Sequence, residues 1–357
     1  TLLSGARLTE AEDSCRQAIA CRPDYWEACN TLGTVLSQQG RFFESEQCFR
    51  RAIELAPEAV AVNVNLGGVL KDLGRFDEAE ASCRRALRFD ARSADAWASL
   101  LFVLNYHPDR SADEVFAAYL EYARHFGQPY RATWRAHDNQ RSLQRRLKVG
   151  YVSPALRQHS SRHFLEPLLA QHDHSVVEVY AYAELAREDA VTARYKAHVD
   201  HWVPTQGLSD EVLAQRIRGD GIDILVDLAG HTAGNRLQVF ARKPAPVSLH
   251  WLDFGYTTGL SAIDYYLTDW PSVPQGSEAL FSEAPWRLTG PSLVYRPAEA
   301  MGEVGPLPAA GKGYVTFGTL TRAVRINHHT VRVWAQILQQ LPNARMVIDR
   351  SEERRVG

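Results

Sequence analysis

Three short polar stretches of the sequence carry side chains that could act on a polar substrate. SPALRQHSSRH, residues 153–163, holds His159 and a second histidine four positions later, among serines and arginines. GHTAGN, residues 230–235, adds His231, and FGYTTGLS, residues 254–261, adds two threonines. Imidazole exchanges protons near neutral pH, threonine hydroxyls suit sugars, and glycine lets a backbone approach a ligand closely. These residue types indicate proton transfer on a sugar-like substrate.

Each polar stretch follows a segment with the pattern of a β-strand. Short β-branched or aromatic runs begin at residue 147 and alternate with helical segments such as LSDEVLAQRIRGDG. The strand runs are LKVGYVS, VVEVYAYA, IDILVDLAG, PVSLHWLDF and AIDYYLTD. This alternation predicts a mostly parallel sheet with helices on both faces, whose ligands bind beyond the carboxyl ends of the strands. Loop caps and ordinary turn chemistry are the alternative for any single stretch, but three such ends in one sheet favour a site.

A second α/β unit is expected after the Gly/Pro/Ala-rich segment GEVGPLPAAGKG, residues 302–313. Its pattern is strand YVTFGTL, loop TRAVRIN, helix HHTVRVWAQILQQL and strand ARMVID. Arg322 and Arg325 lie in that loop, where cations and a helix N-terminus could meet a nucleotide diphosphate. Two arginines on a solvated surface are the alternative interpretation.

The first third of the sequence repeats itself. A shift of 34 residues superimposes Ala18, Ala52 and Ala86, and it aligns GRFFESE with GRFDEAE. The period, with Leu-Gly in a first helix and alanine in a second, resembles the tetratricopeptide repeat. Two complete repeats, 24–57 and 58–91, are expected with one more helix on each side. Stacked helix pairs form a concave solenoid that grips an extended peptide or protein, although the array could instead only extend the folded core.

Charge and cysteine content limit the classes of partner. Lys+Arg 40 against Asp+Glu 42 leaves a net charge of -2, so no basic field indicates nucleic acid or an anionic membrane as a partner. No apolar run approaches the roughly 18 residues that span a bilayer. The five cysteines are odd in number and form no CxxC pair, which favours reduced packing residues over disulfides or a metal site. A cytoplasmic protein is the resulting expectation.

Several longer motifs together resemble the O-linked N-acetylglucosamine transferase and SPINDLY family. They are YVSPALRQHSSRHF, DILVDLAGHT, KPAPVSLHWLDFGYTTGLSAIDYYLTD and TFGTLTRAVRINHHTVRVWAQIL, and with the repeats the resemblance covers residues 6–349. It implies the fold class α + α/β: a tetratricopeptide-repeat α-solenoid followed by a GT-B glycosyltransferase. It further implies inverting transfer from a nucleotide sugar, expected to be UDP-N-acetylglucosamine, to Ser or Thr of proteins that the repeats bind. No metal or other cofactor is implied, and the sequence has no Asp-x-Asp motif.

The resemblance also assigns roles to the polar stretches. His159 matches the catalytic histidine of the family's cleft, as a base or as a group that orients the substrates. Arg325 stands where many relatives have a lysine on the donor diphosphate, and Arg322 lies in the same loop. Ala155 and Leu156 replace an Asp-Phe pair, which removes a carboxylate that could hold the loop. The residues expected to shape the sugar and acceptor pocket are His231, Thr232, Gly255, Tyr256, Thr257, Thr258 and Gly259.

The expected domain division follows from these motifs. The sequence begins without a methionine inside a repeat and stops after the second strand of the second lobe, so we expect a fragment truncated at both ends that cannot catalyse transfer alone. A non-catalytic tetratricopeptide scaffold and a transferase that uses GDP-fucose are the alternatives. The expected domains are repeats with capping helices at 1–126, a connector at 127–146, a complete N-terminal catalytic lobe at 147–300, the start of a truncated C-terminal nucleotide-binding lobe at 301–349, and a non-native tail, similar to a translated sequencing adapter, at 350–357.

Overall fold

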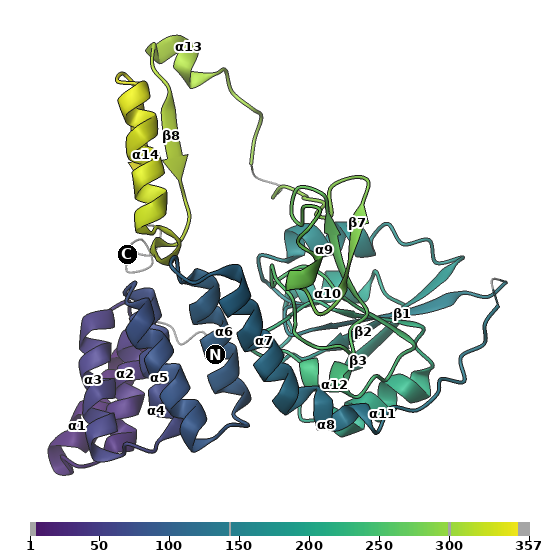
Figure 1. Cartoon of the computed structure of the whole chain (residues 1–357), viewed down its shortest axis with the longest axis horizontal. Helices are drawn as coiled ribbons and strands as arrows, with labels where there is room; N and C mark the ends of the chain where they lie inside the picture. The colour runs from purple at the N-terminus through teal and green to yellow at the C-terminus, as the bar shows by residue number, and fades with distance from the viewer. Residues whose placement is uncertain (1–4, 143, 299–300, 349–357) are drawn as a thin grey trace. The chain divides into compact units, whose positions relative to one another are not determined.

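The computed structural model of the chain describes residues 5–142, 144–298 and 301–348 (Figure 1). The tail expected at 350–357 lies outside these residues. All five cysteines lie inside them and are free thiols. Within the same part of the chain, no helix has both the length and the apolar character needed to cross a bilayer.

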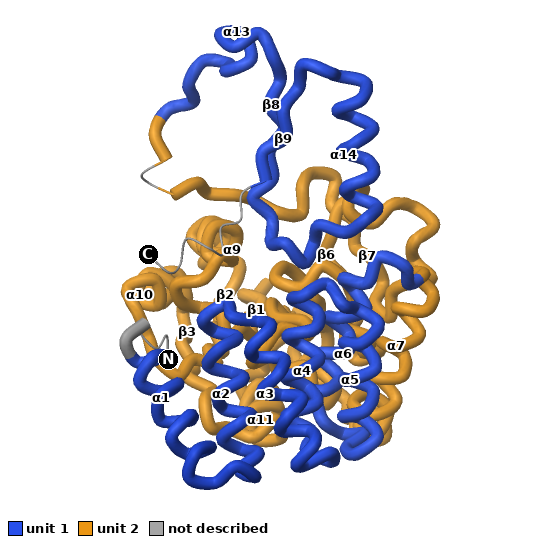
Figure 2. Tube along the Cα trace, turned by 90° about the vertical axis from the view of Figure 1, so that its left-hand side faces the viewer, with its two compact units in different colours: residues 1–110, 303–357 blue, residues 111–302 orange. Residues whose placement is uncertain are grey.

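The chain divides into two compact units (Figure 2). Unit 1 comprises Thr1–Arg110 together with Glu303–Gly357, and unit 2 comprises Ser111–Gly302. Unit 1 therefore holds the repeats and the second α/β unit, whereas unit 2 holds all three polar stretches.

Paired helices in unit 1 confirm the predicted repeats. Small residues lie where the helices approach: a Cβ on Gly33 would lie 2.7 Å from the Phe49 ring, and one on Gly67 would lie 2.6 Å from Cys83 Sγ. Of the aligned alanines, Ala52 and Ala86 are fully buried and Ala18 is half-buried. Tight packing of this kind explains why the repeat keeps glycine and alanine at these positions. The helices are α1 (Gly5–Cys21), α2 (Trp26–Gln38), α3 (Phe42–Leu55), α4 (Val60–Asp72), α5 (Phe76–Phe89) and α6 (Ala94–Tyr106).

An ion pair recurs along the repeats of unit 1. An arginine at the turn before a second helix contacts a glutamate in the second helix of the preceding repeat. The glutamate side chains are largely buried, so the pairs are charge-assisted hydrogen bonds that fix the stacking of successive repeats. The pairs are Arg41–Glu12 at 2.8 Å, Arg75–Glu46 at 2.7 Å and, one repeat later, Arg110–Glu80 at 3.1 Å.

The second α/β unit has the predicted order of strand, loop, helix and strand. Strands β8 (Thr316–Thr319) and β9 (Arg345–Ile348) pair in parallel, and α14 (His328–Gln340) connects them. The Asn327 side chain caps α14 by accepting from the Thr330 backbone N–H at 3.1 Å. The helix therefore begins at the end of the loop that carries the two candidate arginines. The remaining elements of this part are α13 (Pro308–Lys312) and the 3-10 turn η2 (Ala323–Arg325).

A fully parallel sheet organises unit 2, with the strand order β3-β2-β1-β4-β5-β6-β7. The chain moves outward from β1 to β3 and then returns beside β1 to continue from β4 to β7. The connection therefore reverses between β1 and β4, which is the switch point where such sheets bind ligands. The strands are β1 (Leu147–Ser153), β2 (Val177–Ala183), β3 (His201–Pro204), β4 (Ile224–Asp227), β5 (Val247–His250), β6 (Tyr265–Asp269) and β7 (Ala284–Leu288).

The two outermost strands, β3 and β7, are absent from the sequence prediction. Both are short, and each contains a proline, Pro204 or Pro285. Proline removes a ladder hydrogen bond, so it weakens the strand pattern but is tolerated at a sheet edge. The five predicted strands are confirmed as the central ones, and these carry the polar stretches.

Helices cover both faces of the sheet, as the alternating pattern predicts. On one face, Leu165 and Leu169 of α9 (Arg162–Leu169) and Tyr195 of α10 (Ala190–Lys196) join a core with Tyr151 of β1. On the other face lie α11 (Asp210–Asp220) and α12 (Leu237–Ala241) (Figure 1). The short helices α8 (Gln128–Arg131) and η1 (Glu278–Leu280) complete the unit.

Helix α7 (Ala112–Phe126) belongs to unit 2, although the expected repeat domain extends to residue 126. Its buried Tyr119 and Tyr122 rings pack edge-on against His231, with centroids 5.3 and 4.7 Å away. The helix therefore covers the polar stretch that follows β4, and the compact units divide before α7.

Candidate functional site

The three polar stretches meet at the carboxyl edge of the sheet, because β1, β4 and β5 are neighbours. A Cβ on Gly234 would lie 3.0 Å from Pro154 Cβ, so the loop after β4 touches the loop after β1. Gly230 likewise packs directly against Phe254 in the loop after β5, with φ +53 and no room for a side chain. The three loops are therefore in contact with one another at the switch point of the sheet.

The loop after β1 is held although it lacks the family's carboxylate. Ala155 and Leu156 are buried. Asp189, the N-cap residue of α10, accepts from the Gln158 backbone N–H at 2.8 Å, and the Thr192 hydroxyl donates to the Leu156 carbonyl at 2.9 Å. A carboxylate from a neighbouring helix therefore orders the loop, and the replacement of Asp-Phe leaves it structured.

His159 lies in this loop with one ring nitrogen engaged and the other free of any described partner. Its Nδ1 accepts from the Ser161 backbone N–H at 3.3 Å and lies 2.8 Å from the Ser161 hydroxyl. Ser161 therefore engages Nδ1, and Nε2 is the ring nitrogen left for a substrate. Partial burial and then the positive charge of Arg157 lower the pKa of His159, which keeps the ring neutral. The nearby His163 instead binds the Arg296 carbonyl at 2.9 Å and holds a distant loop.

His231 is buried in the wall of the site, with 1% of its surface exposed. Its Nε2 donates to the Thr258 carbonyl at 2.9 Å, which ties the loop after β4 to the loop after β5. Burial lowers the pKa of His231 to about 4, so the ring is neutral. Its neighbour Thr232 is half-buried and donates its hydroxyl to the Ala229 carbonyl at 2.8 Å. The described structure therefore gives His231 no surface for a ligand.

Thr257 and Thr258 are also fully buried. Both hydroxyls donate to the buried carboxylate of Glu283, Thr257 at 2.5 Å, and the Thr258 backbone N–H donates to it at 2.8 Å. Gly259 has φ +81, and a Cβ there would lie 2.7 Å from the Tyr119 carbonyl oxygen. These hydroxyls order the loop instead of facing solvent.

Gly255 and Tyr256 complete the third stretch. Gly255 is exposed, and a Cβ there would meet nothing within 4 Å. Tyr256 is half-buried, and its ring packs edge-on against Tyr119 with centroids 5.1 Å apart. Its buried hydroxyl has no hydrogen-bond partner among the described residues. Of the predicted pocket residues, Thr232, Gly255 and Tyr256 are the ones that keep accessible surface.

A buried ion pair supports the site, and the sequence prediction missed it. Asp227 ends β4 and His250 ends β5, both are fully buried, and His250 Nδ1 lies 2.7 Å from Asp227 Oδ2. His250 Nε2 donates to the Phe254 carbonyl at 2.8 Å, while Asp227 also accepts from the Gly230 N–H at 2.8 Å. Because both ring nitrogens face acceptors, His250 is an imidazolium. A polar residue ending each of the apolar runs ILVD and VSLH is the one signal that the sequence offers.

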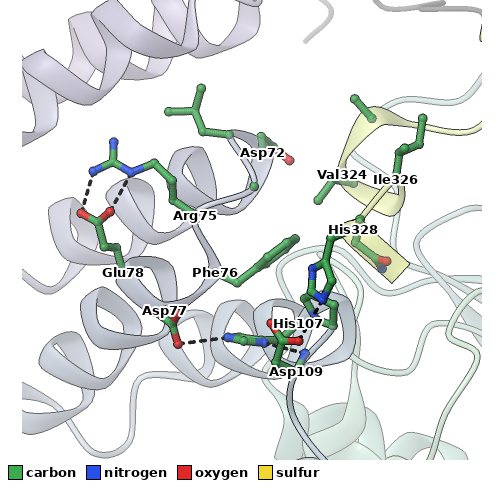
Figure 3. A pocket seen from close by; sticks show the side chains of 15 residues that line it. Asp72, Arg75, Phe76, Asp77, Glu78, His107, Asp109, Val324, Ile326 and His328 are labelled. Atoms are coloured by element: carbon green, nitrogen blue, oxygen red, sulfur yellow. Dashed lines mark hydrogen bonds and ion pairs between the residues drawn. The ribbon is translucent and has the colours of Figure 1, made fainter. Parts of the chain in front are cut away.

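The two candidate phosphate-binding arginines belong to unit 1, whereas all other predicted site residues belong to unit 2. Arg322 lies 3.3 Å from Asp72 Oδ1, and Arg325 is exposed at the end of η2. A pocket of about 500 Å³ in unit 1 is lined by residues of the segments 72–78, 107–109 and 323–328 (Figure 3). The loop of the two arginines therefore forms part of a concave surface.

One group of potential metal ligands occurs among the described residues, beside this pocket. Asp109, His328 and His329 each bring a ligand atom within 4.8 Å of the other two. All three side chains are exposed. Asp109 forms ion pairs with His328 at 3.2 Å (Figure 3) and with His329 at 3.4 Å. These ion pairs account for the arrangement without an ion.

Comparison with known families confirms both parts of the chain. Residues 122–286 match the family model described as Glycosyl transferase family 41, and residues 30–96 match a tetratricopeptide repeat model. The solved structure of a mutant O-GlcNAc transferase from Thermobaculum terrenum is similar, with a TM-score of 0.85 and 32% identity, covering 98% of this chain and 68% of that one. The order of a repeat array followed by a GT-B transferase fold is thus confirmed.

Curated relatives show the same similarity. The chain is 34% identical over 266 residues to a protein of Solanum lycopersicum and 36% identical over 266 residues to one of Oryza sativa subsp. japonica, both named as probable UDP-N-acetylglucosamine–peptide N-acetylglucosaminyltransferase SPINDLY. Each alignment covers 73% of this chain and 28% or 29% of the relative. The matched part therefore spans under a third of the length of these relatives.

Proposed function

Because the chain belongs to the O-linked N-acetylglucosamine transferase and SPINDLY family of glycosyltransferases, we propose that the complete gene product transfers a sugar from a nucleotide sugar to Ser or Thr hydroxyls of proteins. The observation that carries this proposal is the meeting of three polar loops at the switch point of the parallel sheet. Relatives are named as enzymes that use UDP-N-acetylglucosamine and a peptide, which supports UDP-N-acetylglucosamine as the donor. The tetratricopeptide repeats would bind the acceptor protein.

The reaction sets two requirements for the site. A hydroxyl is a poor nucleophile, so a group must accept its proton, and the departing diphosphate needs positive charge. We assign Arg325, with Arg322 beside it, to the diphosphate, where arginine would replace a metal ion. Nucleotide sugar is then the one co-substrate, and no metal takes part.

In unit 2, we assign contact with the substrates to the accessible residues and support of the pocket to the buried ones. His159 presents Nε2, its unengaged ring nitrogen, to the substrates, as a base or as a group that orients them. Thr232, Gly255 and Tyr256 form the accessible floor of the sugar and acceptor pocket. The buried residues His231, Thr257, Thr258 and Gly259 hold that floor in shape. The five free cysteines support a reducing, cytoplasmic location.

The direct test is a transfer assay with the complete gene product, UDP-N-acetylglucosamine and a peptide rich in Ser and Thr. We expect the peptide to gain one N-acetylhexosamine by mass spectrometry, with EDTA present or absent. Arg325→Ala is expected to raise the KM for the donor about tenfold or more, since a charge-assisted contact is lost. Arg325→Lys should retain more affinity, and Arg92→Ala, at an exposed arginine of the same unit, should change nothing.

The same assay separates the alternative functions. Transfer from GDP-fucose but not from UDP-N-acetylglucosamine would show that the donor is GDP-fucose, while the reaction would still be sugar transfer to protein hydroxyls. No transfer and no binding of either nucleotide sugar would contradict the proposal and favour a repeat scaffold. The loss of the family's carboxylate at Ala155 would favour the scaffold if it left the loop disordered, but Asp189 orders this loop.

A further inference from the structure

Three side chains that can bind a metal converge beside the pocket of unit 1. Asp109 lies in the turn that follows α6, and His328 and His329 begin α14. Nε2 of His328 lies 3.2 Å from Asp109 Oδ1, and Nε2 of His329 lies 3.4 Å from the same oxygen (Figure 3). All three residues belong to unit 1. The fold of this unit therefore gathers two imidazoles and one carboxylate from segments far apart in the sequence.

The two histidines point the same way although they are adjacent in a helix. Adjacent residues of a helix ordinarily do not face each other. The rings of His328 and His329 nevertheless lie with centroids 4.0 Å apart and planes tilted by 42°. Apart from this ring contact, the pairs with Asp109 are the only polar or ring contacts of either imidazole among the described residues. The Asp109 oxygen is thus the point on which both rings converge.

The distances at this point are those between ligands of one metal ion. The ion pairs keep the three groups together without an ion, but neither is a hydrogen bond of the described residues. Zn²⁺ holds its nitrogen and oxygen ligands at about 2.0 to 2.1 Å, so neighbouring ligands of a tetrahedral site lie about 3.3 to 3.4 Å apart. The two nitrogen–oxygen distances, 3.2 and 3.4 Å, agree with this spacing. All three ligand atoms lie within 4.8 Å of one another.

Both segments that carry the ligands are anchored. The Asp109 backbone N–H donates to Nδ1 of the buried His107 at 3.2 Å, and Nε2 of that ring lies 3.2 Å from Asp77 Oδ1. The start of α14 is fixed by its cap, in which Asn327 accepts from the Thr330 backbone N–H at 3.1 Å. Supporting hydrogen bonds of this kind hold metal ligands in position. The carboxylate and the two imidazoles are therefore placed before a metal arrives.

The ligand atoms favour one class of cation. Imidazole nitrogen suits zinc and related transition metals, whereas Mg²⁺ and Ca²⁺ prefer sites made of oxygen alone. All three side chains are exposed, so a hydrated cation can enter and keep a water as its fourth ligand. Three protein ligands and one water are a coordination that zinc adopts in proteins.

We propose that Asp109, His328 and His329 bind a zinc ion that connects the turn after α6 to the start of α14. The two imidazole nitrogens and the carboxylate oxygen replace three waters of the hydrated ion, and any proton on a ligating nitrogen is released to solvent. The site lies outside the three polar loops assigned to sugar transfer, all of which belong to unit 2. The zinc ion would hold the repeats against the second α/β part within unit 1, so this inference does not rest on the proposed function.

The test is a zinc titration of the complete gene product, purified without a polyhistidine tag and freed of metal by EDTA, which is then removed. Competition with a chromophoric zinc chelator should show one more bound zinc in the wild type than in His328→Ala, His329→Ala or Asp109→Asn. Each variant should weaken this site at least about tenfold, since even loss of a supporting partner costs that much. Mg²⁺ should not compete. His174→Ala, at an exposed histidine paired with Asp200 at 2.9 Å, is the matched control and should bind zinc like the wild type.

Cobalt identifies the ligands independently. Co²⁺ in place of zinc should give the visible absorption of a four-coordinate site without the intense near-ultraviolet bands of cobalt–thiolate bonds, because coordination geometry and ligand type determine the spectrum. The visible bands should be absent from His329→Ala. This result separates the site from the five free cysteines. Excess zinc should also raise the thermal midpoint of the wild type more than that of His329→Ala, because binding to the folded state stabilises it.

The outcomes decide the inference without a transfer assay. Zinc affinity that is equal in the wild type and in all folded ligand variants would overturn it, as would cobalt bands of thiolate ligands alone or no zinc binding. All three ligand side chains are exposed, so we expect the variants to fold. If thermal unfolding shows that one does not, the remaining folded variants decide. Absence of sugar transfer would contradict the proposed function and leave the zinc result unchanged.

Discussion

At the residue scale, the buried Asp227–His250 pair is the feature that most shapes the candidate site. The pair joins the ends of β4 and β5 and extends through hydrogen bonds to Gly230 and Phe254, so it connects two of the three polar loops. A buried pair of charges is expensive to assemble, and removal of one partner leaves the other uncompensated. The pair therefore orders the two loops. The desolvation cost of its two charges is offset only while both partners and their hydrogen bonds are in place.

The pair predicts a pH-dependent stability of unit 2. Burial alone would lower the pKa of His250, but the hydrogen bond and charge of Asp227 outweigh it, so the pKa of His250 is raised. The pair's contribution to the free energy of unfolding is therefore complete below about 6.5, the ordinary histidine pKa, and is lost as the pH rises through the raised value. His250→Ala should reduce the free energy of unfolding by about 3 kcal/mol at pH 6, and the difference from wild type should shrink at pH 9.

Urea unfolding followed by tryptophan fluorescence at both pH values measures this difference. His174→Ala, at an exposed histidine paired with Asp200, serves as the control and should change little. A difference between wild type and His250→Ala that grew toward pH 9 would contradict a charged His250.

At the element scale, packing within a repeat depends on which helix face a glycine occupies. Gly67 and Gly68 are neighbours in α4, yet their surroundings differ. A Cβ on Gly67 would lie 2.6 Å from Cys83 Sγ and 3.3 Å from the Ala79 carbonyl oxygen, whereas a Cβ on Gly68 would meet nothing within 4 Å. The first glycine is required by packing against α5, and the second is not.

The two neighbouring glycines give a prediction in which Gly68 is the control for Gly67. Gly67→Ala should destabilise the repeats by about 2 kcal/mol, because the extra methyl group overpacks the contact with α5. Gly68→Ala should stabilise them by up to about 1 kcal/mol, since alanine favours a helix. Urea midpoints and amide hydrogen exchange of α4 and α5 measure both effects. Equal effects of the two substitutions would show that the Gly67 contact does not limit packing.

At the scale of the whole molecule, the division into two compact units locates the boundary before α7. Tyr119 of α7 packs on His231, and its carbonyl oxygen lies against Gly259, so the helix supports two of the polar loops. The domain division expected from sequence places this helix with the repeats as a capping helix, although it is out of register with them. Helical periodicity shows that a face is buried but not what covers it.

The boundary can be tested with two segments of the chain. Residues 111–302 should fold and unfold cooperatively, because they keep α7 over the core of unit 2. Residues 127–302 should lose that cooperativity, because removal of α7 exposes His231 and the surrounding aromatic rings to water. Near-UV circular dichroism during thermal unfolding distinguishes the two. Identical melting curves would place α7 outside the folding unit.

Local patterns in the sequence determined the elements of this protein and the position of its candidate site. The repeat period, the five central strands and the polar loops at their carboxyl ends each depend on residues close together in the chain, so they could be predicted. The burial of the threonines against Glu283 and the Asp227–His250 pair could not. These contacts join residues more than twenty positions apart.

Only the tertiary structure decided which polar side chains face solvent. A threonine or histidine in a loop has the same sequence signature whether it binds a substrate or a buried carboxylate. Thr257 donates to the buried Glu283 carboxylate and His231 to the Thr258 carbonyl, while His159 and Gly255 are exposed. The physical reason is that a buried polar group must find a hydrogen-bond partner, and packing of distant segments determines whether that partner is the protein itself.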